Sequence, residues 1–429
     1  MPVMVALVLA ALAPVAAQGQ EEEPEATEVG VTADEIRIAV VADVENAAAP
    51  GLFQGAVDGV KGWAKFINKE GGLAGRDVKV DFIDSQLSAD EARNAVIQAC
   101  EEDVALVATS ALFLSNVSDL VGCPDEAGNP TGLPDLALVV TEVDQQCNPT
   151  TFPINPPGIV CDTAGDSPET YKVPAGRSFY YQKEFGDLSG VFVYPSDLKS
   201  ANNTTRVVGG GMIETGVEEV EQIDVSALAP QSAFTPVVQK IREEGATYAM
   251  NMSAFAGTVS LRKEAALQGV TDVEVWDCTI QCYDQGLIEQ GGADVEDQFV
   301  SVNIVPVEER KQSDVADDFV KSVGKSKADG FSAQAWASAS LFGTVIEAIV
   351  EEAGVNGITR AALLEQLAAV EDFDADGLIG PTDVGAREPS PCYALLQVQD
   401  GEFVRVYPKK KTTFDCKRRN VVEIELDLL

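Results

Sequence analysis

The sequence predicts an α/β protein with two doubly wound parallel-sheet lobes. Three observations lead to this prediction. The chain has 429 residues, 45% of them hydrophobic, which is enough to bury more than one core. Apolar runs of strand length alternate with segments of helical periodicity between residues 36 and 140. A second alternating set begins at Val191, so the chain builds the same kind of layer again.

The first set contains four predicted strands with two helices between them. The strands are Ile36–Val41, Val78–Phe82, Val104–Ala108 and Leu136–Val140, and the helices cover 51–68 and 88–101. Gly71-Gly72 ends the first helix, and Ser88 caps the second. Strands and helices that alternate at this spacing make a parallel sheet, whose carboxyl edge is where a ligand binds.

The second set follows an irregular stretch, 144–175, whose two cysteines and six prolines predict a loop or crossover. Its predicted strands are Val191–Tyr194, Arg206–Gly211, Thr247–Met252 and Val273–Asp277, with helices at Phe234–Glu244 and Thr258–Gln268. Phe299–Val305 is expected to carry the chain back to the first lobe. Helices at Ala333–Glu352 and Arg360–Val370 and a hairpin of Tyr393–Val398 with Phe403–Tyr407 complete the chain.

The charge of the chain excludes several classes of function. The formal net charge is −39, from 69 acidic and 30 basic residues, so the surface repels phosphate backbones and favours a soluble monomer. The basic clusters Lys409–Lys411 and Lys417–Arg419 are interpreted as the charged cap of a terminal hairpin. The chain has no histidine, which excludes Ser-His and Cys-His catalytic triads and histidine-based metal sites.

The N-terminus has the pattern of an export signal. Residues 1–17 are apolar and end in small residues, and Glu21–Glu23 begin an acidic leader that spans 18–33 and is expected to be mobile up to Gly30. A basic region is missing at the start, so the segment is either cleaved after Ala17 or kept as an N-terminal anchor. No later stretch approaches about 18 consecutive apolar residues, the length of a membrane span.

Eight cysteines in an exported chain indicate disulfides. Pairing neighbours in order would give four short loops, although the sequence does not fix the connectivity. Those pairs would be Cys100–Cys123, Cys147–Cys161, Cys278–Cys282 and Cys392–Cys416. No second pair repeats the spacing of Cys278 and Cys282, so a zinc site is not expected.

Several blocks of sequence resemble the leucine/isoleucine/valine-binding protein family, the type I periplasmic binding proteins of ABC importers. At the N-terminal end these blocks are Val31–Ile38, Gly55–Gly59, Phe66–Arg76 and Phe82–Ser85. Towards the other end they are Phe373-Asp374, Gly377–Pro381, Cys392–Val398 and Gly401–Phe403. The resemblance runs from about residue 31 to 407.

The resemblance implies two lobes that close on a solute like a hinged trap and then present a surface to a membrane permease. Lobe 1 is expected to comprise 34–150 with 303–385, and lobe 2 to comprise 151–302 with 386–429. The three hinge crossings are expected near 145–180, 300–306 and 380–392. The implied role is an exported, non-enzymatic solute-binding subunit without a cofactor, which binds an amino acid or a related small polar ligand. A ligand-sensing ectodomain of the same fold is the alternative.

The predicted ligand-binding residues follow the strands. An amino-acid carboxylate needs backbone N–H groups and hydroxyls, and its ammonium needs an acidic or carbonyl oxygen. In lobe 1 the candidates are Asn46, Thr109, Ser110, Ala111, Thr141 and Glu142. In lobe 2 they are Ser196, Asp197, Ser253 and Tyr283. Loop capping or solvation explains each of these residues as well.

One further pattern suggests calcium. Asp372, Asp374 and Asp376-Gly377 followed by Asp383 nearly match a calcium-binding loop. Pro381 lies inside this loop and no helix can follow it, so a metal is not expected. Paired carboxylates are plentiful in so acidic a chain, but no spacing singles out two of them for catalysis.

Overall fold

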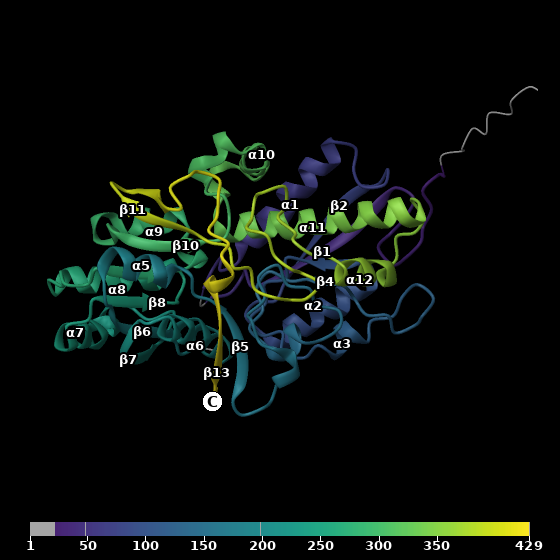
Figure 1. Ribbon diagram of the computed structural model, residues 1–429. Helices are drawn as coiled ribbons and strands as arrows, with labels where there is room; N and C mark the ends of the chain where they lie inside the picture. Colours follow the sequence, from purple (N-terminus) through teal and green to yellow (C-terminus); the bar gives the residue numbers. More distant parts are fainter. Residues whose placement is uncertain (1–21, 48, 198, 429) are drawn as a thin grey trace, which may run out of the picture.

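Two separate β-sheets divide the molecule into two lobes (Figure 1). The computed structural model describes residues 22–47, 49–197 and 199–428. The predicted fold class is confirmed, because both sheets are built on parallel strands that alternate with helices. The signal prediction for residues 1–17 lies outside the described residues.

Lobe 1 is built on a four-stranded parallel sheet of order β2-β1-β3-β4. Its strands are β1 (Glu35–Ala42), β2 (Asp77–Asp84), β3 (Ala105–Val107) and β4 (Asp135–Leu136). Its helices are α1 (Gln54–Lys69), α2 (Ala89–Glu102), α3 (Ser118–Val121), α4 (Val143–Gln146), α10 (Asp314–Val323), α11 (Gly330–Ala353) and α12 (Arg360–Ala368). The predicted cap is confirmed, since the Ser88 side chain accepts a hydrogen bond from the Glu91 N–H.

Lobe 2 is built on a seven-stranded sheet of order β12-β11-β10-β9-β8-β6-β7. Its strands are β6 (Ser189–Pro195), β7 (Glu218–Val225), β8 (Tyr248–Asn251), β9 (Val275–Cys278), β10 (Gln298–Val302), β11 (Ala394–Gln399) and β12 (Glu402–Tyr407). Its helices are α5 (Arg177–Phe185), α6 (Lys199–Glu214), α7 (Thr235–Glu244), α8 (Phe255–Leu267) and α9 (Gln285–Gly291). The predicted closing hairpin is confirmed as the antiparallel pair β11–β12, with Asp400 and Gly401 at positive φ in its turn.

The predicted strand Arg206–Gly211 is wrong, because these residues lie inside helix α6. Consecutive glycines and β-branched residues disfavour a helix, but here the missing side chains let α6 approach its neighbours. A Cβ atom on Gly209 would lie 2.1 Å from the Tyr194 hydroxyl, and one on Gly211 would lie 2.6 Å from Val173. Tertiary packing therefore overrides local propensity in this helix.

The segment Phe299–Val305, which was expected to carry the chain back to lobe 1, does so only in its last residues. Its first residues belong to β10, and the chain leaves the second sheet after Val302. It enters that sheet at Ser189, coming from β4, and rejoins it at Ala394 after the second stay in lobe 1. The exact lobe boundaries stay a prediction.

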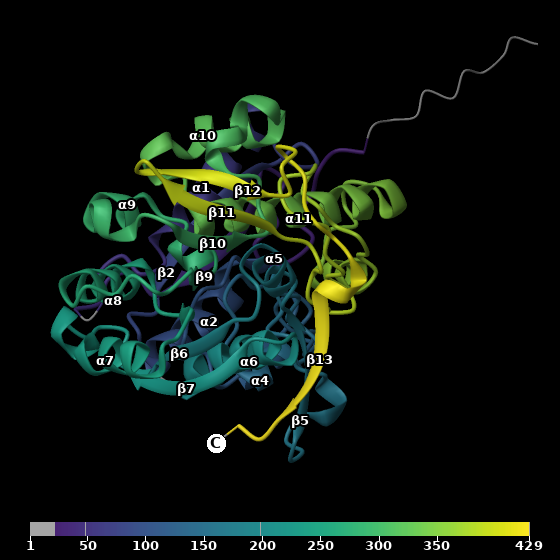
Figure 2. The same cartoon turned by 60° about the vertical axis from the view of Figure 1, so that its left-hand side comes forward.

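A two-stranded antiparallel ribbon lies apart from both sheets. It pairs β5 (Glu169–Pro174), in the first crossover, with β13 (Val421–Leu426), near the end of the chain (Figure 2). In Figure 1 this ribbon stands between the two lobes. Helix α6 packs on it, since a Cβ atom on Gly210 would lie 2.8 Å from Ile424. The ribbon thus positions α6 beside lobe 1.

The acidic leader is held against lobe 1 where the structure describes it. The Glu25 N–H donates to Asn356 Oδ1 at 2.8 Å, and the Thr27 hydroxyl donates to the Ile358 carbonyl at 2.6 Å. Arg76, which is 1% exposed, donates to the Glu25 carbonyl at 2.8 Å. The expectation of a mobile leader is therefore wrong for residues 22–30.

Helix α11 runs through the core of lobe 1. It is long and apolar enough to cross a membrane by length and composition, but 72% of its apolar window is buried inside the protein. One hydrophobic cluster extends from this helix to Cys278, Cys282 and Tyr283 of lobe 2. The Gly330 N–H also donates to the Tyr283 carbonyl at 3.0 Å. Along this contact the two lobes are packed together.

All eight cysteines form disulfides with their neighbours in order. The bridges are Cys100–Cys123, Cys147–Cys161, Cys278–Cys282 and Cys392–Cys416. Of the pairings that the sequence left open, the sequential one is therefore confirmed.

Candidate ligand-binding site between the lobes

A buried carboxylate, Asp43, organises the edge of lobe 1 where the strands end. Asp43 follows β1 and is fully buried. Its Oδ1 accepts hydrogen bonds from the Ser85 hydroxyl at 2.6 Å and the Leu87 N–H at 2.8 Å, and its Oδ2 accepts one from the Leu112 N–H at 2.8 Å. The loops after β1, β2 and β3 are thereby joined. Sequence reasoning missed Asp43, although a charged residue directly after an apolar strand was an available signal.

Thr109, Ser110 and Ala111 follow β3 as expected, but each is at most 2% exposed. The Ser110 hydroxyl donates to the Ala108 carbonyl at 3.0 Å. The Thr109 hydroxyl is buried without a partner in the described part of the chain. In this conformation both hydroxyls lie beneath the surface, and their contact with a ligand stays a prediction.

The candidates that follow β6 and β8 in lobe 2 lie at the carboxyl ends of neighbouring parallel strands. Ser196 and Asp197 are exposed after β6, and the Asp197 carboxylate accepts a hydrogen bond from the Ala227 N–H. Ser253 follows β8 and is 3% exposed, and its N–H donates to Asn251 Oδ1 at 3.1 Å. These contacts cap loops, and a ligand-binding role for the three residues remains untested.

Two other candidates, Tyr283 and Asn46, form hydrogen bonds with nearby protein groups. The Tyr283 hydroxyl donates to the Glu308 carboxylate at 2.6 Å and accepts from the Val307 N–H at 2.7 Å. This places its ring inside the packed contact between the lobes. Asn46 closes a turn, because its side chain both accepts from and donates to the backbone of Ala49.

Thr141 and Glu142, by contrast, line a cavity between the lobes. Its volume is about 690 Å³, within the range of small-molecule sites. Its walls come from α4 and the loop before it, from the first crossover, from α6 and from the end of the chain. The polar residues that line it are Thr141, Glu142, Asp144, Gln146, Asp166, Ser167, Glu169, Tyr171, Lys199, Ser200, Asn203, Thr204 and Asp427.

The cavity is lined by one lysine, on α6, and by five carboxylates, two of which belong to lobe 1. The first turn of α6 contributes Lys199 and Ser200, and backbone N–H groups at a helix N-terminus attract anions. The Ser200 hydroxyl oxygen is buried without a hydrogen-bond partner in the described residues. Glu142 and Asp144 come from the lobe-1 wall.

One disulfide and one hydrogen bond fix residues in the walls of this cavity. The disulfide Cys147–Cys161 joins the end of α4 to the crossover. Burial raises the pKa of Tyr171, and the neighbouring Glu169 carboxylate raises it further. The phenol therefore stays protonated and donates a hydrogen bond to Glu169.

Sequence reasoning missed the α6 side of the cavity. Lys199, Ser200, Asn203, Thr204 and Val207 follow one another at helical spacing and all line it. The pattern was hidden because the glycines that follow suggested a strand instead of a helix. Within the described residues no cluster of three or more acidic or cysteine side chains could hold a metal ion.

Comparisons with known proteins agree with this architecture. A family model described as periplasmic binding protein matches residues 35–402. No curated protein sequence matches at a significant level.

Among solved structures, an ABC transporter substrate-binding protein from Aeropyrum pernix is similar, with a TM-score of 0.71 at 14% identity over 90% of this chain and 97% of the other. The leucine-binding protein LivK from Thermotoga maritima gives a TM-score of 0.64 at 15% identity, covering 86% of this chain and 97% of its own. A solute-binding protein from R. palustris in complex with benzoate gives 0.65 at 15% identity, covering 90% and 98%. Because the family model covers most of the chain and the two lobes have the corresponding topology, the chain belongs to the periplasmic binding protein family, with the type I fold.

Proposed function

We propose that this protein is the extracytoplasmic solute-binding subunit of an ABC importer, and that it binds an amino acid or a closely related zwitterion in the interlobe cavity. Family membership already assigns it a solute-binding and non-enzymatic role. The proposal adds the class of ligand, export by way of residues 1–17, a monomeric state and a membrane permease as partner.

The observation that carries the ligand class is the charge arrangement of the cavity. A ligand carboxylate would accept hydrogen bonds from the Ser200 hydroxyl and from the first turn of α6, with Lys199 beside it. The ligand ammonium would donate to Glu142. Similar proteins bind either leucine or benzoate, so the two ends of the ligand must be tested separately.

Isothermal titration calorimetry with three ligand sets tests this proposal: free amino acids, the corresponding amines and the corresponding carboxylic acids. Each charge-assisted contact contributes about 1.5–3 kcal/mol, so Lys199→Met and Glu142→Gln should each weaken amino-acid binding by about tenfold or more. Lys65→Met and Glu289→Gln change the same charges at exposed positions that do not line the cavity and should leave binding unchanged.

Two outcomes would count against a zwitterion. If carboxylic acids bind as tightly as amino acids and Glu142→Gln has no effect, the ligand is an anion. If no member of the three sets binds and none raises the melting temperature, the proposed ligand class is wrong.

A further inference from the structure

The interlobe cavity offers more negative charge than a single ligand ammonium can balance. One lysine and five carboxylates line it, and the carboxylates are Glu142, Asp144, Asp166, Glu169 and Asp427. Across the part of the chain that the structure describes, none of the five forms an ion pair with a lysine or arginine. If Lys199 faces the ligand carboxylate and Glu142 faces its ammonium, the other carboxylates still lack a positive partner.

A buried acceptor on the lobe-1 wall also lacks a donor. Gln146, on α4, lines the cavity and is 0% exposed. Its Nε2 donates to the Ile159 carbonyl at 3.0 Å, which fixes the orientation of the amide. Its Oε1 has no hydrogen-bond partner among the described residues. A buried carbonyl oxygen in this state is unfavourable, and an N–H group of a ligand would supply the missing donor.

A second group of acceptors lies at one end of the β5–β13 ribbon, on a different wall. Glu169 begins β5, and Asp427 directly follows β13, the partner strand. The Glu169 carboxylate accepts hydrogen bonds from the Gly165 N–H at 2.8 Å and from the buried Tyr171 hydroxyl. The Ser167 hydroxyl donates to Asp427. These uncharged donors hold the two carboxylates in place without neutralising them.

The same cavity has apolar wall residues and is small enough for its charges to act on a ligand. Val143, Pro157, Ile159, Val207 and Leu428 also line it, and the methylene groups of a ligand would pack on them. A sphere of the cavity's volume is about 11 Å across, close to the Debye length of about 8–10 Å at moderate salt. Salt therefore screens the wall carboxylates from a bound ligand only in part.

We propose that the ligand is a cationic amino acid, whose side chain ends in an ammonium or guanidinium group, a proposal that rests on the proposed function above and narrows its ligand class. The ligand carboxylate would lie at the first turn of α6, and the α-ammonium would donate to Glu142 and to Gln146 Oε1. The side-chain cation would lie among Asp166, Glu169 and Asp427. A neutral side chain would leave the charge of that wall uncompensated.

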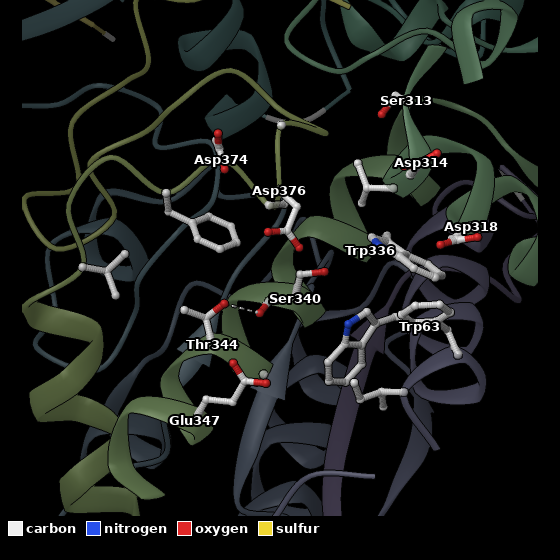
Figure 3. Close-up of a pocket in the computed structure, with 18 of the residues that line it drawn as sticks. Trp63, Ser313, Asp314, Asp318, Trp336, Ser340, Thr344, Glu347, Asp374 and Asp376 are labelled. Atoms are coloured by element: carbon white, nitrogen blue, oxygen red, sulfur yellow. Dashed lines mark hydrogen bonds between the residues drawn. The ribbon is translucent and has the colours of Figure 1, made fainter. Parts of the chain in front are cut away.

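Lobe 1 contains a second cavity lined by carboxylates, which provides a control. Its volume is about 1030 Å³, it shares no lining residue with the interlobe cavity, and Asp374 and Asp376 are among the residues that line it (Figure 3). Of the buried polar atoms that lack a partner in the described residues, none belongs to its lining. Removing charge there lowers the net charge of the protein without changing the walls around the proposed ligand.

Isothermal titration calorimetry with L-lysine and L-norleucine tests the proposal. The two amino acids share the same carbon chain, but norleucine lacks the side-chain ammonium. Lysine should bind more tightly by about tenfold or more, because its second ammonium gains charge-assisted contacts. The ratio of the two Kd values should shrink as the NaCl concentration rises from about 0.05 to about 0.5 M, because salt screens the attraction.

A pair of double variants locates the effect. Asp166→Asn/Asp427→Asn removes two exposed carboxylates of the cavity and keeps an oxygen for the Ser167 hydroxyl. It should raise the Kd for lysine by about threefold or more and leave the Kd for norleucine unchanged. Asp374→Asn/Asp376→Asn removes two carboxylates from the lobe-1 cavity, and Asn tolerates the positive φ of Asp376. This control should leave both Kd values unchanged.

The possible failures are distinguishable. If norleucine binds as tightly as lysine or more tightly, the ligand is not a cationic amino acid, although the proposed function stands. An unchanged Kd for lysine in Asp166→Asn/Asp427→Asn, or an equal loss for both ligands, would overturn the assigned position of the side-chain cation. If no free amino acid binds at all, the proposed function fails, and the narrower ligand class fails with it.

Discussion

The buried carboxylate of Asp43 is expected to hold the lobe-1 edge of the ligand site in place. Asp43→Asn keeps the size of the side chain but replaces one oxygen by an NH2 group, which then faces an N–H donor. If the remaining oxygen stays with Ser85 and Leu87, the N–H of Leu112 loses its acceptor. An unpaired buried N–H costs about 1–3 kcal/mol, and two bonds to a neutral acceptor instead of a charged one cost about 1 kcal/mol each. The loss should total about 3–5 kcal/mol.

Urea unfolding followed by circular dichroism measures this loss, and calorimetry with the ligand measures its effect on the site. Affinity should fall as well, because the Thr141 hydroxyl donates to the Leu112 carbonyl at 3.3 Å and Thr141 lines the cavity. Asp272→Asn, an exposed change of the same kind, should shift stability by less than about 0.5 kcal/mol. If Asp43→Asn costs no more than this control, the carboxylate does not organise the loops.

Three further changes test the fold. Burial, reinforced by Asp81, raises the pKa of Asp103 from 3.8 to about 8. Its carboxyl therefore stays protonated in the folded state while the unfolded chain ionises, and stability falls as pH rises from about 4 to 8. Asp103→Asn should remove that fall in pH-dependent urea unfolding and gain on the order of 3 kcal/mol at pH 7, whereas an unchanged pH slope would contradict the reasoning. Gly209→Ala should cost about 2 kcal/mol in the same assay despite the better helix propensity of Ala, and a stabilised variant would show that the helix is not closely packed. Replacing Cys147 and Cys161 by Ala should lower stability by about 3 kcal/mol and weaken ligand binding, as calorimetry would show, and unaltered binding would mean that this wall does not shape the cavity.

The parts of the fold that the sequence predicted well are those in which local pattern and tertiary environment agree. The runs that became β1, β8 and β9 are apolar and buried, and α1 carries its apolar residues on one face. Helix α6 was missed because its glycines serve contacts with Tyr194 and β5, which no local pattern reveals. Strand β7 was missed because it is an edge strand rich in acidic residues, with few buried positions.

The sequence predicted only those residues of the candidate site that belong to lobe 1. Thr141 and Glu142 could be found because they follow an apolar run, and the carboxyl edge of a parallel sheet is where ligands bind. The opposite wall depends on the docking of α6 onto the ribbon of β5 and β13, whose two strands lie far apart in sequence. Tyr283 also follows a strand, but its hydroxyl is taken up by Glu308, which only the tertiary structure shows.

The positions of the four disulfides bear on how the molecule can move. Each bridge spans between 4 and 24 residues of sequence, and none joins a strand of one sheet to a strand of the other. The disulfides therefore stabilise each lobe and the first crossover, but they do not link the two sheets covalently. If the lobes close on a solute as the proposed function requires, that motion is opposed and guided by noncovalent contacts alone, and the differential affinity of the solute for the two states can bias it.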